Sequence, residues 1–115
     1  MNVISTLKKN SDFRRLYAKG KSAVNPYMAV YCRRSPMKTG RVGYTVSVKL
    51  GHAVVRNRVR RRLREVYRLN RERVKPGVDI VIVARSRCVG AEFGKLESAY
   101  LDACARLGIL AEETT

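Results

Sequence analysis

Three segments of the chain have the patterns of β-strands, which are aromatic and β-branched residues, apolar-polar alternation, and a continuous apolar run. The segments cover residues 27–34, 41–50 and 78–84. The last of them, VDIVIVA, is almost continuously apolar, which indicates a central strand that is buried on both faces.

The two faces of the predicted strand 41–50 differ in chemistry. The apolar face carries Val42, Tyr44, Val46, Val48 and Leu50. Thr45, Ser47 and Lys49 share the opposite face. We therefore expect this strand to have a wet side that presents hydroxyl groups and one cation.

Three other segments repeat their apolar residues at intervals of three and four, which predicts helices. They cover residues 11–20, 54–73 and 91–107. In the first helix, Ser11 is the expected N-cap and Gly20 the stop, with Phe13, Leu16 and Tyr17 on one side. The order helix, strand, strand, helix, strand, helix favours an α+β fold with one small mixed sheet. We expect a single domain over residues 1–115, with a core of about 8–107 and a frayed tail at 109–115.

The predicted helix 54–73 is unusually rich in arginine. Nine arginines between residues 56 and 73 face only two acids, Glu65 and Glu72. On a helical projection Val55, Val59, Leu63 and Val66 form one stripe, while Arg60, Arg61, Arg64, Arg68 and Arg71 share the far side. Arg62 falls near the apolar stripe, so we expect its stem to run along the core and its head to reach the rim. An unbalanced row of like charges costs stability, and therefore favours a surface that meets a polyanion over a merely solvated one.

The composition of the whole chain supports a polyanionic partner. There are 25 Lys and Arg residues against 9 Asp and Glu, which gives a formal net charge of +16. Nucleic acid is the first candidate and an anionic membrane surface the second. The sequence has neither a transmembrane run nor the pattern of a secretion signal, so we expect a cytoplasmic protein. Cys32, Cys88 and Cys104 are widely spaced and predict buried free thiols.

The titratable residues do not predict a catalytic centre. His52 is the single histidine, and the nine acids are scattered without motif-like spacing. Neither a zinc site nor a phosphate-binding loop is expected. We expect no catalytic residue and no metal ligand in this chain.

One segment, RVGYTVSVKLGHAVVRNRVRRRLREVYR (41–68), resembles the protein subunit of bacterial ribonuclease P. The centre of the resemblance is Arg56-Asn57-Arg58, and it continues through DFRRLYAKG (12–20), YMAVY (27–31) and VDIVIVAR (78–85). The resemblance implies an accessory subunit of a ribonucleoprotein that removes the 5′ leader of precursor tRNA. In that family the RNA subunit carries out hydrolysis with bound Mg²⁺, and the protein alone holds no cofactor.

The resemblance also implies a fold and two binding surfaces. The fold is a sandwich like domain 2 of ribosomal protein S5, with a left-handed βαβ crossover. The residues implied to bind the catalytic RNA are Arg56, Asn57, Arg58, Arg60, Arg61, Arg64 and Arg68. The implied contacts to the leader are Phe13, Tyr17 and Tyr31, together with Ser47, Lys49 and Arg85. Phe13 has a second interpretation, as a core residue of its short helix.

Two positions depart from the family pattern. Val48 stands where a further basic residue is common, and His52 where Asn or Lys is common. Among other functions, a ribosomal or other structural RNA-binding protein remains the main alternative. A nuclease acting without RNA and a membrane-surface binder are disfavoured, the latter because the arginine helix needs its apolar stripe for its own core. The expected partners are therefore the catalytic RNA and precursor tRNA, with neither DNA nor a membrane.

Overall fold

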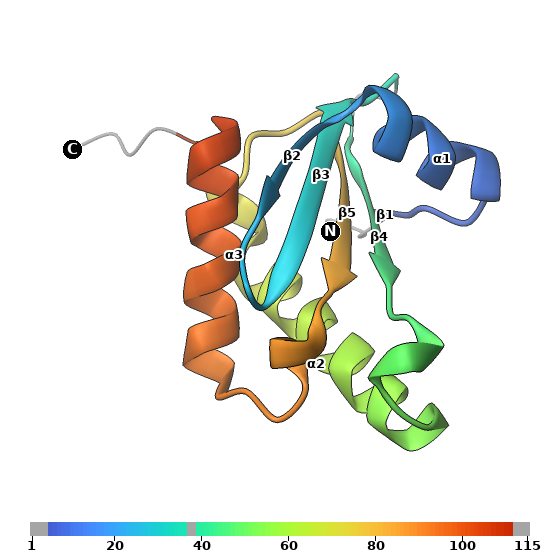
Figure 1. The fold of residues 1–115 in the computed structure, drawn as a ribbon. Helices are drawn as coiled ribbons and strands as arrows, with labels where there is room; N and C mark the ends of the chain where they lie inside the picture. The colour runs from blue at the N-terminus through green and yellow to red at the C-terminus, as the bar shows by residue number, and fades with distance from the viewer. Residues whose placement is uncertain (1–4, 37–38, 112–115) are drawn as a thin grey trace.

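The structure is a computed structural model that describes residues 5–36 and 39–111, and it contains one five-stranded sheet with helices on both faces (Figure 1). The strands are β1 (Ser5–Thr6), β2 (Lys21–Val24), β3 (Met28–Arg34), β4 (Arg41–Thr45) and β5 (Val78–Ala84). The α-helices are α1 (Asn10–Lys19), α2 (Ala53–Asn70) and α3 (Phe93–Leu107). Three short 3₁₀ turns connect them, η1 (Val48–Leu50), η2 (Arg71–Arg73) and η3 (Ser86–Cys88).

Strand β5 lies at the centre of the sheet, in the order β1-β4-β5-β3-β2. It pairs in parallel with β4, where Val42 faces Ile80, and antiparallel with β3, where Val30 faces Ile82. The prediction of a central strand buried on both faces is therefore confirmed. Strands β1 and β2 were not predicted, because two and four residues are too few to display a period.

The predicted strand 41–50 is twice as long as the observed strand β4 (Arg41–Thr45). The alternation holds as far as Val46, which is buried, but β4 ends at Thr45. Beyond it the Ser47 side chain accepts a hydrogen bond from the Lys49 backbone N–H, and this cap starts η1. A local side-chain bond of this kind competes with the ladder of a sheet. Val48 is consequently 73% exposed instead of sharing the buried face.

The helices agree with the prediction better than the strands do. Helix α1 begins at Asn10 with Lys9 at the N-cap, so Ser11 is not the cap as expected. Helix α2 ends at Asn70, and the last three predicted residues form η2. Helix α3 stops at Gly108, whose φ of 72° is the left-handed conformation that glycine adopts easily.

The helices divide into two layers. Helices α2 and α3 pack together on one face of the sheet, and α1 covers part of the other (Figure 1). In Figure 1 the parallel strands β4 and β5 run downward, β4 lies to the right of β5, and α2 lies behind the sheet. The connection from β4 through α2 to β5 is therefore left-handed. The α+β sandwich and its unusual crossover, implied by the resemblance, are thus present.

The core is split by the sheet into a larger and a smaller cluster. The larger one includes Val59, Leu63 and Val66 of α2, which confirms the apolar stripe predicted for that helix. Arg62 lies beside this stripe, and its guanidinium donates a hydrogen bond to the Ala91 carbonyl oxygen. This agrees with the expectation that its stem runs along the core while its head reaches the rim. The buried cysteines Cys32, Cys88 and Cys104 are all free thiols. Burial raises the pKa of the Cys88 and Cys104 thiols to about 11, so they stay protonated and unreactive near neutral pH.

Residues 109–111 are not the frayed tail that we expected. Ile109 is buried, and its carbonyl oxygen accepts a hydrogen bond from the Lys75 N–H at 2.8 Å. The Ala111 N–H donates to the Arg73 carbonyl oxygen at 2.7 Å. These bonds flank a β-bridge between Val74 and Leu110, and together they hold residues 109–111 against the segment that follows α2. Residues 112–115 lie outside the described part.

Helix α1 is attached to the sheet by an ionic cluster around Arg41. The Arg41 guanidinium donates to both carboxylate oxygens of Asp79, at 3.2 Å and 2.7 Å, and to Asp12 of α1 at 3.3 Å. The Asp79 side chain is only 4% exposed, and it also accepts the Arg41 backbone N–H. These bonds raise the pKa of Arg41, chiefly through the hydrogen bond to Asp79. The cluster therefore fixes where α1 crosses the sheet.

We expect Arg41→Met to lower the free energy of unfolding by about 3 kcal/mol, because it leaves the Asp79 carboxylate buried without its partner. Urea denaturation measures this loss. Arg68→Met is the control, because it breaks an exposed ion pair with Glu65 and should cost far less. Similar small losses for both variants would show that the Arg41 cluster does not hold the fold.

Candidate RNA interface

The outer side of α2 forms a cationic surface, which we call the arginine face. It comprises Arg56, Asn57, Arg58, Arg60, Arg61, Arg64 and Arg68. Arg58, Arg61 and Arg64 are exposed and make no ion pair with any described acidic residue. Their charge is left uncompensated within this domain; the helical projection predicted an outward position for Arg61 and Arg64 but did not include Arg58.

Other members of the arginine face are partly occupied by local contacts. The Arg56 Nε donates to the Gly51 carbonyl oxygen at 3.2 Å and so ties the start of α2 to η1. The Arg60 guanidinium donates to the Asn57 side-chain oxygen at 3.1 Å. Arg68 is paired with Glu65, and this hydrogen bond lowers the pKa of the Glu65 carboxyl. The strongest unpaired charge therefore lies on the N-terminal and middle turns of α2.

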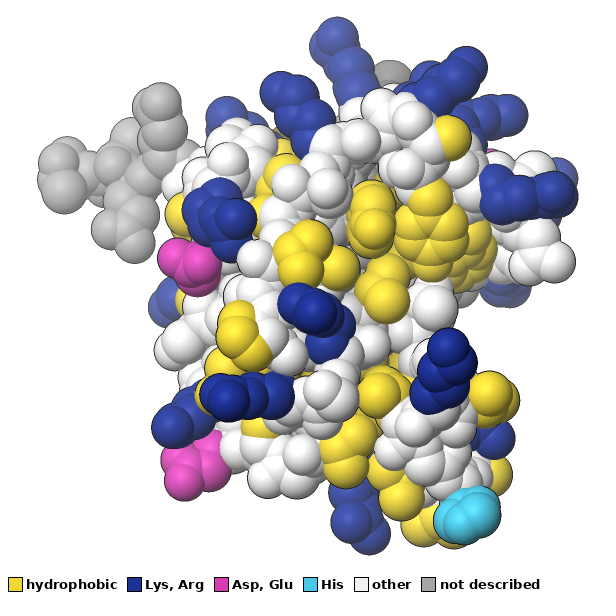
Figure 2. Space-filling model, viewed as in Figure 1, with side chains coloured by type: hydrophobic (Ala, Val, Ile, Leu, Met, Phe, Trp, Pro, Cys, Tyr) yellow, Lys and Arg dark blue, Asp and Glu magenta, His cyan; other side chains and the backbone are white. Residues whose placement is uncertain are grey.

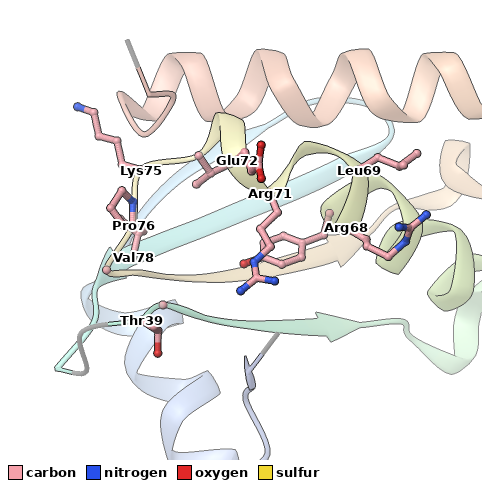
Figure 3. A pocket seen from close by; sticks show the side chains of 12 residues that line it. Thr39, Arg68, Leu69, Arg71, Glu72, Lys75, Pro76 and Val78 are labelled. Atoms are coloured by element: carbon pink, nitrogen blue, oxygen red, sulfur yellow. The ribbon is translucent and has the colours of Figure 1, made fainter. Parts of the chain in front are cut away.

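A cavity of about 640 Å³ lies at the C-terminal end of the arginine face. It is lined by residues of α2, η2 and the turn before β5, among them Arg68, Arg71 and Lys75, and by Thr39 and Gly40 before β4. Figure 3 shows Arg68 and Leu69 toward one end, Lys75 and Pro76 toward the other, and Arg71 extending between them. Glu72 is the one acid among the lining residues, so the cavity prolongs the cationic surface beyond α2.

Three aromatic side chains meet on the opposite face of the sheet, beside α1. The ring centroids of Tyr17 and Tyr31 lie 5.0 Å apart at an interplanar angle of 76°. The Phe13 and Tyr17 centroids are 6.5 Å apart. The Tyr17 hydroxyl is hydrogen-bonded to the Thr45 hydroxyl at 2.6 Å, which holds its ring over β4. We call Phe13, Tyr17 and Tyr31 the aromatic cluster.

The members of the aromatic cluster differ in accessibility. Tyr17 is 39% exposed, whereas Phe13 is half-buried and packs against Leu7, Leu16 and Val81. A Cβ on Gly43 would lie 2.6 Å from the Phe13 ring, so this ring needs a glycine beneath it. The core interpretation of Phe13 thus describes most of its contacts, and Tyr17 is the most open ring of the three.

The sheet beside the aromatic cluster is not covered by a helix. A row of neighbouring small side chains crosses it from β4 to β2, formed by Thr45, Val83, Ala29 and Val24. Figure 2 shows hydrophobic side chains grouped on this face with Lys and Arg side chains around them. The row is therefore a shallow apolar floor, with aromatic rings at one side and cations around it.

Three predicted leader contacts lie outside the aromatic cluster. Ser47 is the N-cap of η1 and Lys49 lies within it, so neither occupies a strand face as we expected. Lys49 is exposed, while the Ser47 oxygen already accepts the Lys49 N–H. Arg85 follows β5, and its guanidinium donates to the Asn25 carbonyl oxygen at 3.0 Å, in the turn between β2 and β3.

Sequence reasoning did not assign Arg106 to any site. Its guanidinium reaches from α3 to the Val24 carbonyl oxygen, at 3.1 Å. Because 82 positions separate the two residues, no local pattern could have indicated this contact.

Residues 5–36 and 39–111 contain no group of three or more His, Cys, Asp and Glu residues arranged to hold a metal ion. None of the helices described there is long and apolar enough to cross a membrane.

Comparison with known proteins gives consistent matches. The sequence model of the family described as Ribonuclease P matches residues 1–108. The ribonuclease P protein component of Alkaliphilus oremlandii is 44% identical over 110 residues, which is 96% of both chains. That of Clostridioides difficile is 44% identical over 109 residues, covering 94% of this chain and 96% of its own.

Solved structures agree with the sequence matches. The RNase P protein of Staphylococcus aureus superposes with a TM-score of 0.84 at 28% identity, over 95% of this chain and all of the other. The RNase P protein of Thermotoga maritima has a TM-score of 0.80 at 30% identity, over 89% and 96% of the two chains. Sequence and fold together show that this chain belongs to the bacterial ribonuclease P protein family.

Proposed function

We propose that this protein is the accessory subunit of ribonuclease P, which binds the catalytic RNA and the 5′ leader of precursor tRNA. The observation that carries the proposal is the separation of two RNA-suited surfaces on opposite sides of one sheet. The arginine face lies on the layer formed by α2 and α3, and the aromatic cluster lies on the layer formed by α1. One side can therefore hold the catalytic RNA while the other remains free for substrate.

The arginine face is suited to a folded RNA. A guanidinium can bind a phosphate through two hydrogen bonds, and it is less strongly hydrated than an ammonium group. The exposed side chains of Arg58, Arg61 and Arg64 project from a helix whose backbone is already ordered before binding. We assign assembly with the catalytic RNA to this face.

The aromatic cluster and the open sheet are suited to a single strand. Unpaired bases stack on aromatic rings without demanding one sequence, and nearby cations follow the phosphates. Tyr17 and Tyr31 offer such rings above a floor of small side chains. Lys49 and Arg85 are exposed cations that follow the parallel strands β4 and β5 at one end of the sheet. Tolerance of sequence is what leaders of many different tRNA precursors require.

We assign no hydrolytic step to this chain. General acid–base chemistry needs a positioned pair of groups, and metal-assisted hydrolysis needs a set of ligands. The Asp12 and Asp79 carboxylates are both bonded to Arg41, which leaves them unsuited to either role. In this proposal Mg²⁺ is held by the RNA, the protein contributes binding and orientation, and the complex works in the cytoplasm.

We expect the protein, mixed with a catalytic RNA of this family at near-physiological Mg²⁺, to increase the rate of leader removal over RNA alone. The measurement is cleavage of precursor tRNA with a 5′ label. The protein without RNA should not cleave. Binding to ribosomal RNA together with no stimulation of cleavage would favour a structural RNA-binding protein instead.

We expect Tyr17→Ala to weaken binding of leader-bearing precursor by about fivefold or more, since one base–aromatic stack is worth about 1–3 kcal/mol. Binding of mature tRNA should change little. Tyr17→Phe keeps the ring and loses only the bond to Thr45, so it should retain most of the affinity. Equal losses for precursor and mature tRNA would remove Tyr17 from the leader path.

We expect Arg64→Ala to weaken assembly with the catalytic RNA and to reduce the slope of log K against log salt by about 0.7–0.9, the effect of one lost phosphate contact. Filter binding over a series of salt concentrations measures both. Arg62→Ala is the control on the same helix, because Arg62 is bonded to Ala91 inside the domain. It should reduce stability and leave the slope unchanged; a similar slope change for both variants would contradict the assignment of the arginine face.

A further inference from the structure

Two arginines from distant elements hold neighbouring carbonyl groups at the edge of the sheet. Arg106 of α3 donates to the Val24 carbonyl oxygen, and Arg85 after β5 donates to the Asn25 carbonyl oxygen. Both arginines are exposed. Each of these hydrogen bonds uses one guanidinium nitrogen, so most of the five N–H groups of each side chain are available to a ligand.

The turn that receives these arginines is itself firmly held. The Asn25 side-chain oxygen accepts the backbone N–H groups of Tyr27 and Met28, both at 3.0 Å. Its amide nitrogen donates to the Ala99 carbonyl oxygen of α3 at 3.1 Å. The two guanidinium groups are therefore anchored to a rigid turn instead of swinging freely on long side chains, which lowers the entropy lost on binding.

The same edge is the end of the apolar floor described above. The row that begins at Thr45, beneath Tyr17, passes over Val83 and Ala29 and ends at Val24. Val24 is 45% exposed, and its own carbonyl group holds Arg106. Four neighbouring strands span about 14 Å, at about 4.8 Å between strands. A strand of RNA that follows the row from the aromatic cluster thus reaches the arginine pair after a few nucleotides.

We propose that Arg106 and Arg85 form a second binding site for the leader, which holds backbone phosphates beyond the nucleotides that stack on the aromatic cluster. The inference rests on the proposed function and names a part of the substrate that the aromatic cluster does not reach. Its ligand is a phosphodiester, and base identity should not matter, because a contact to a backbone phosphate does not read the edge of a base. Short leaders end before this site, whereas long leaders occupy it.

A purely structural role for Arg106 makes a different prediction. If the bond to Val24 only fastens α3 to β2, its loss changes stability and affects every substrate alike. If the charge holds a phosphate, the loss appears only with leaders that are long enough to reach the edge. Leader length therefore separates the two roles within one variant.

The experiment uses the complex of the catalytic RNA with the full-length protein, and precursor tRNAs that carry short, intermediate or long leaders. Apparent affinity is obtained from the dependence of single-turnover cleavage on the concentration of the complex. We expect Arg106→Ala to weaken binding of long-leader precursor roughly threefold to tenfold, as for a single exposed charge-assisted contact, and short-leader precursor less than about twofold. The salt slope for the long leader should fall by about 0.7.

Matched variants complete the test. Arg106→Lys keeps the charge and should restore most of the long-leader affinity, and Arg73→Ala removes an equal charge from η2 and should show no dependence on leader length. A loss that is equal for all leaders, or no loss for any, would overturn the proposal. Tyr17→Ala distinguishes this failure from that of the proposed function, because it should weaken the precursors whose leaders reach the aromatic cluster even if the arginine pair has no role. If wild-type protein shows no preference for a leader at all, both proposals fall.

Discussion

The arrangement of this molecule depends on the burial of β5 on both of its faces. Val30 and Cys32 of β3 and Ile80 and Ile82 of β5 lie on the side covered by α2 and α3, while Val81 and Val83 lie on the side of α1. Because successive side chains of a strand point to opposite faces, one apolar strand must carry two separate layers. The larger layer needs the apolar stripe of α2, and this turns the arginines of that helix outward. The smaller layer is covered by the short helix α1 and by Leu7 before it, which leaves part of the sheet open beside Tyr17 and Tyr31.

The distribution of charge follows from the same arrangement. A domain with a net charge of +16 has few carboxylates, and those near the core have structural partners. Asp12 and Asp79 are bonded to Arg41, and Glu97 accepts a hydrogen bond from the buried Asn70. Most of the surface cations are therefore left without acidic neighbours, and their mutual repulsion opposes folding of the isolated protein. Binding of RNA to these cations would relieve the repulsion, so assembly and stability are coupled.

The arginine face and the aromatic cluster differ in how far the sequence alone indicates them. The arginine face lies within one helix, so its residues are brought together by the helical period and the sequence shows them directly. The aromatic cluster joins residues of α1 and β3, and only the resemblance to the ribonuclease P family indicated that Tyr17 and Tyr31 belong together. Ser47 and Lys49 were expected on a strand face from alternation alone, and the cap formed by Ser47 ended the strand before it reached them.

By itself the sequence determined the apolar central strand, the three helices and the outward arginines, because each depends on a period that is complete within a single element. Tertiary structure decided the rest: the pairing of the two-residue β1 and the four-residue β2, the bonding of residues 109–111, and the left-handed connection from β4 to β5. It also decided the positions of Arg85 and Arg106 on neighbouring carbonyl groups. The physical reason is that a short strand or a contact between distant residues has no local signal, since its stability comes only from the partner that folding brings to it.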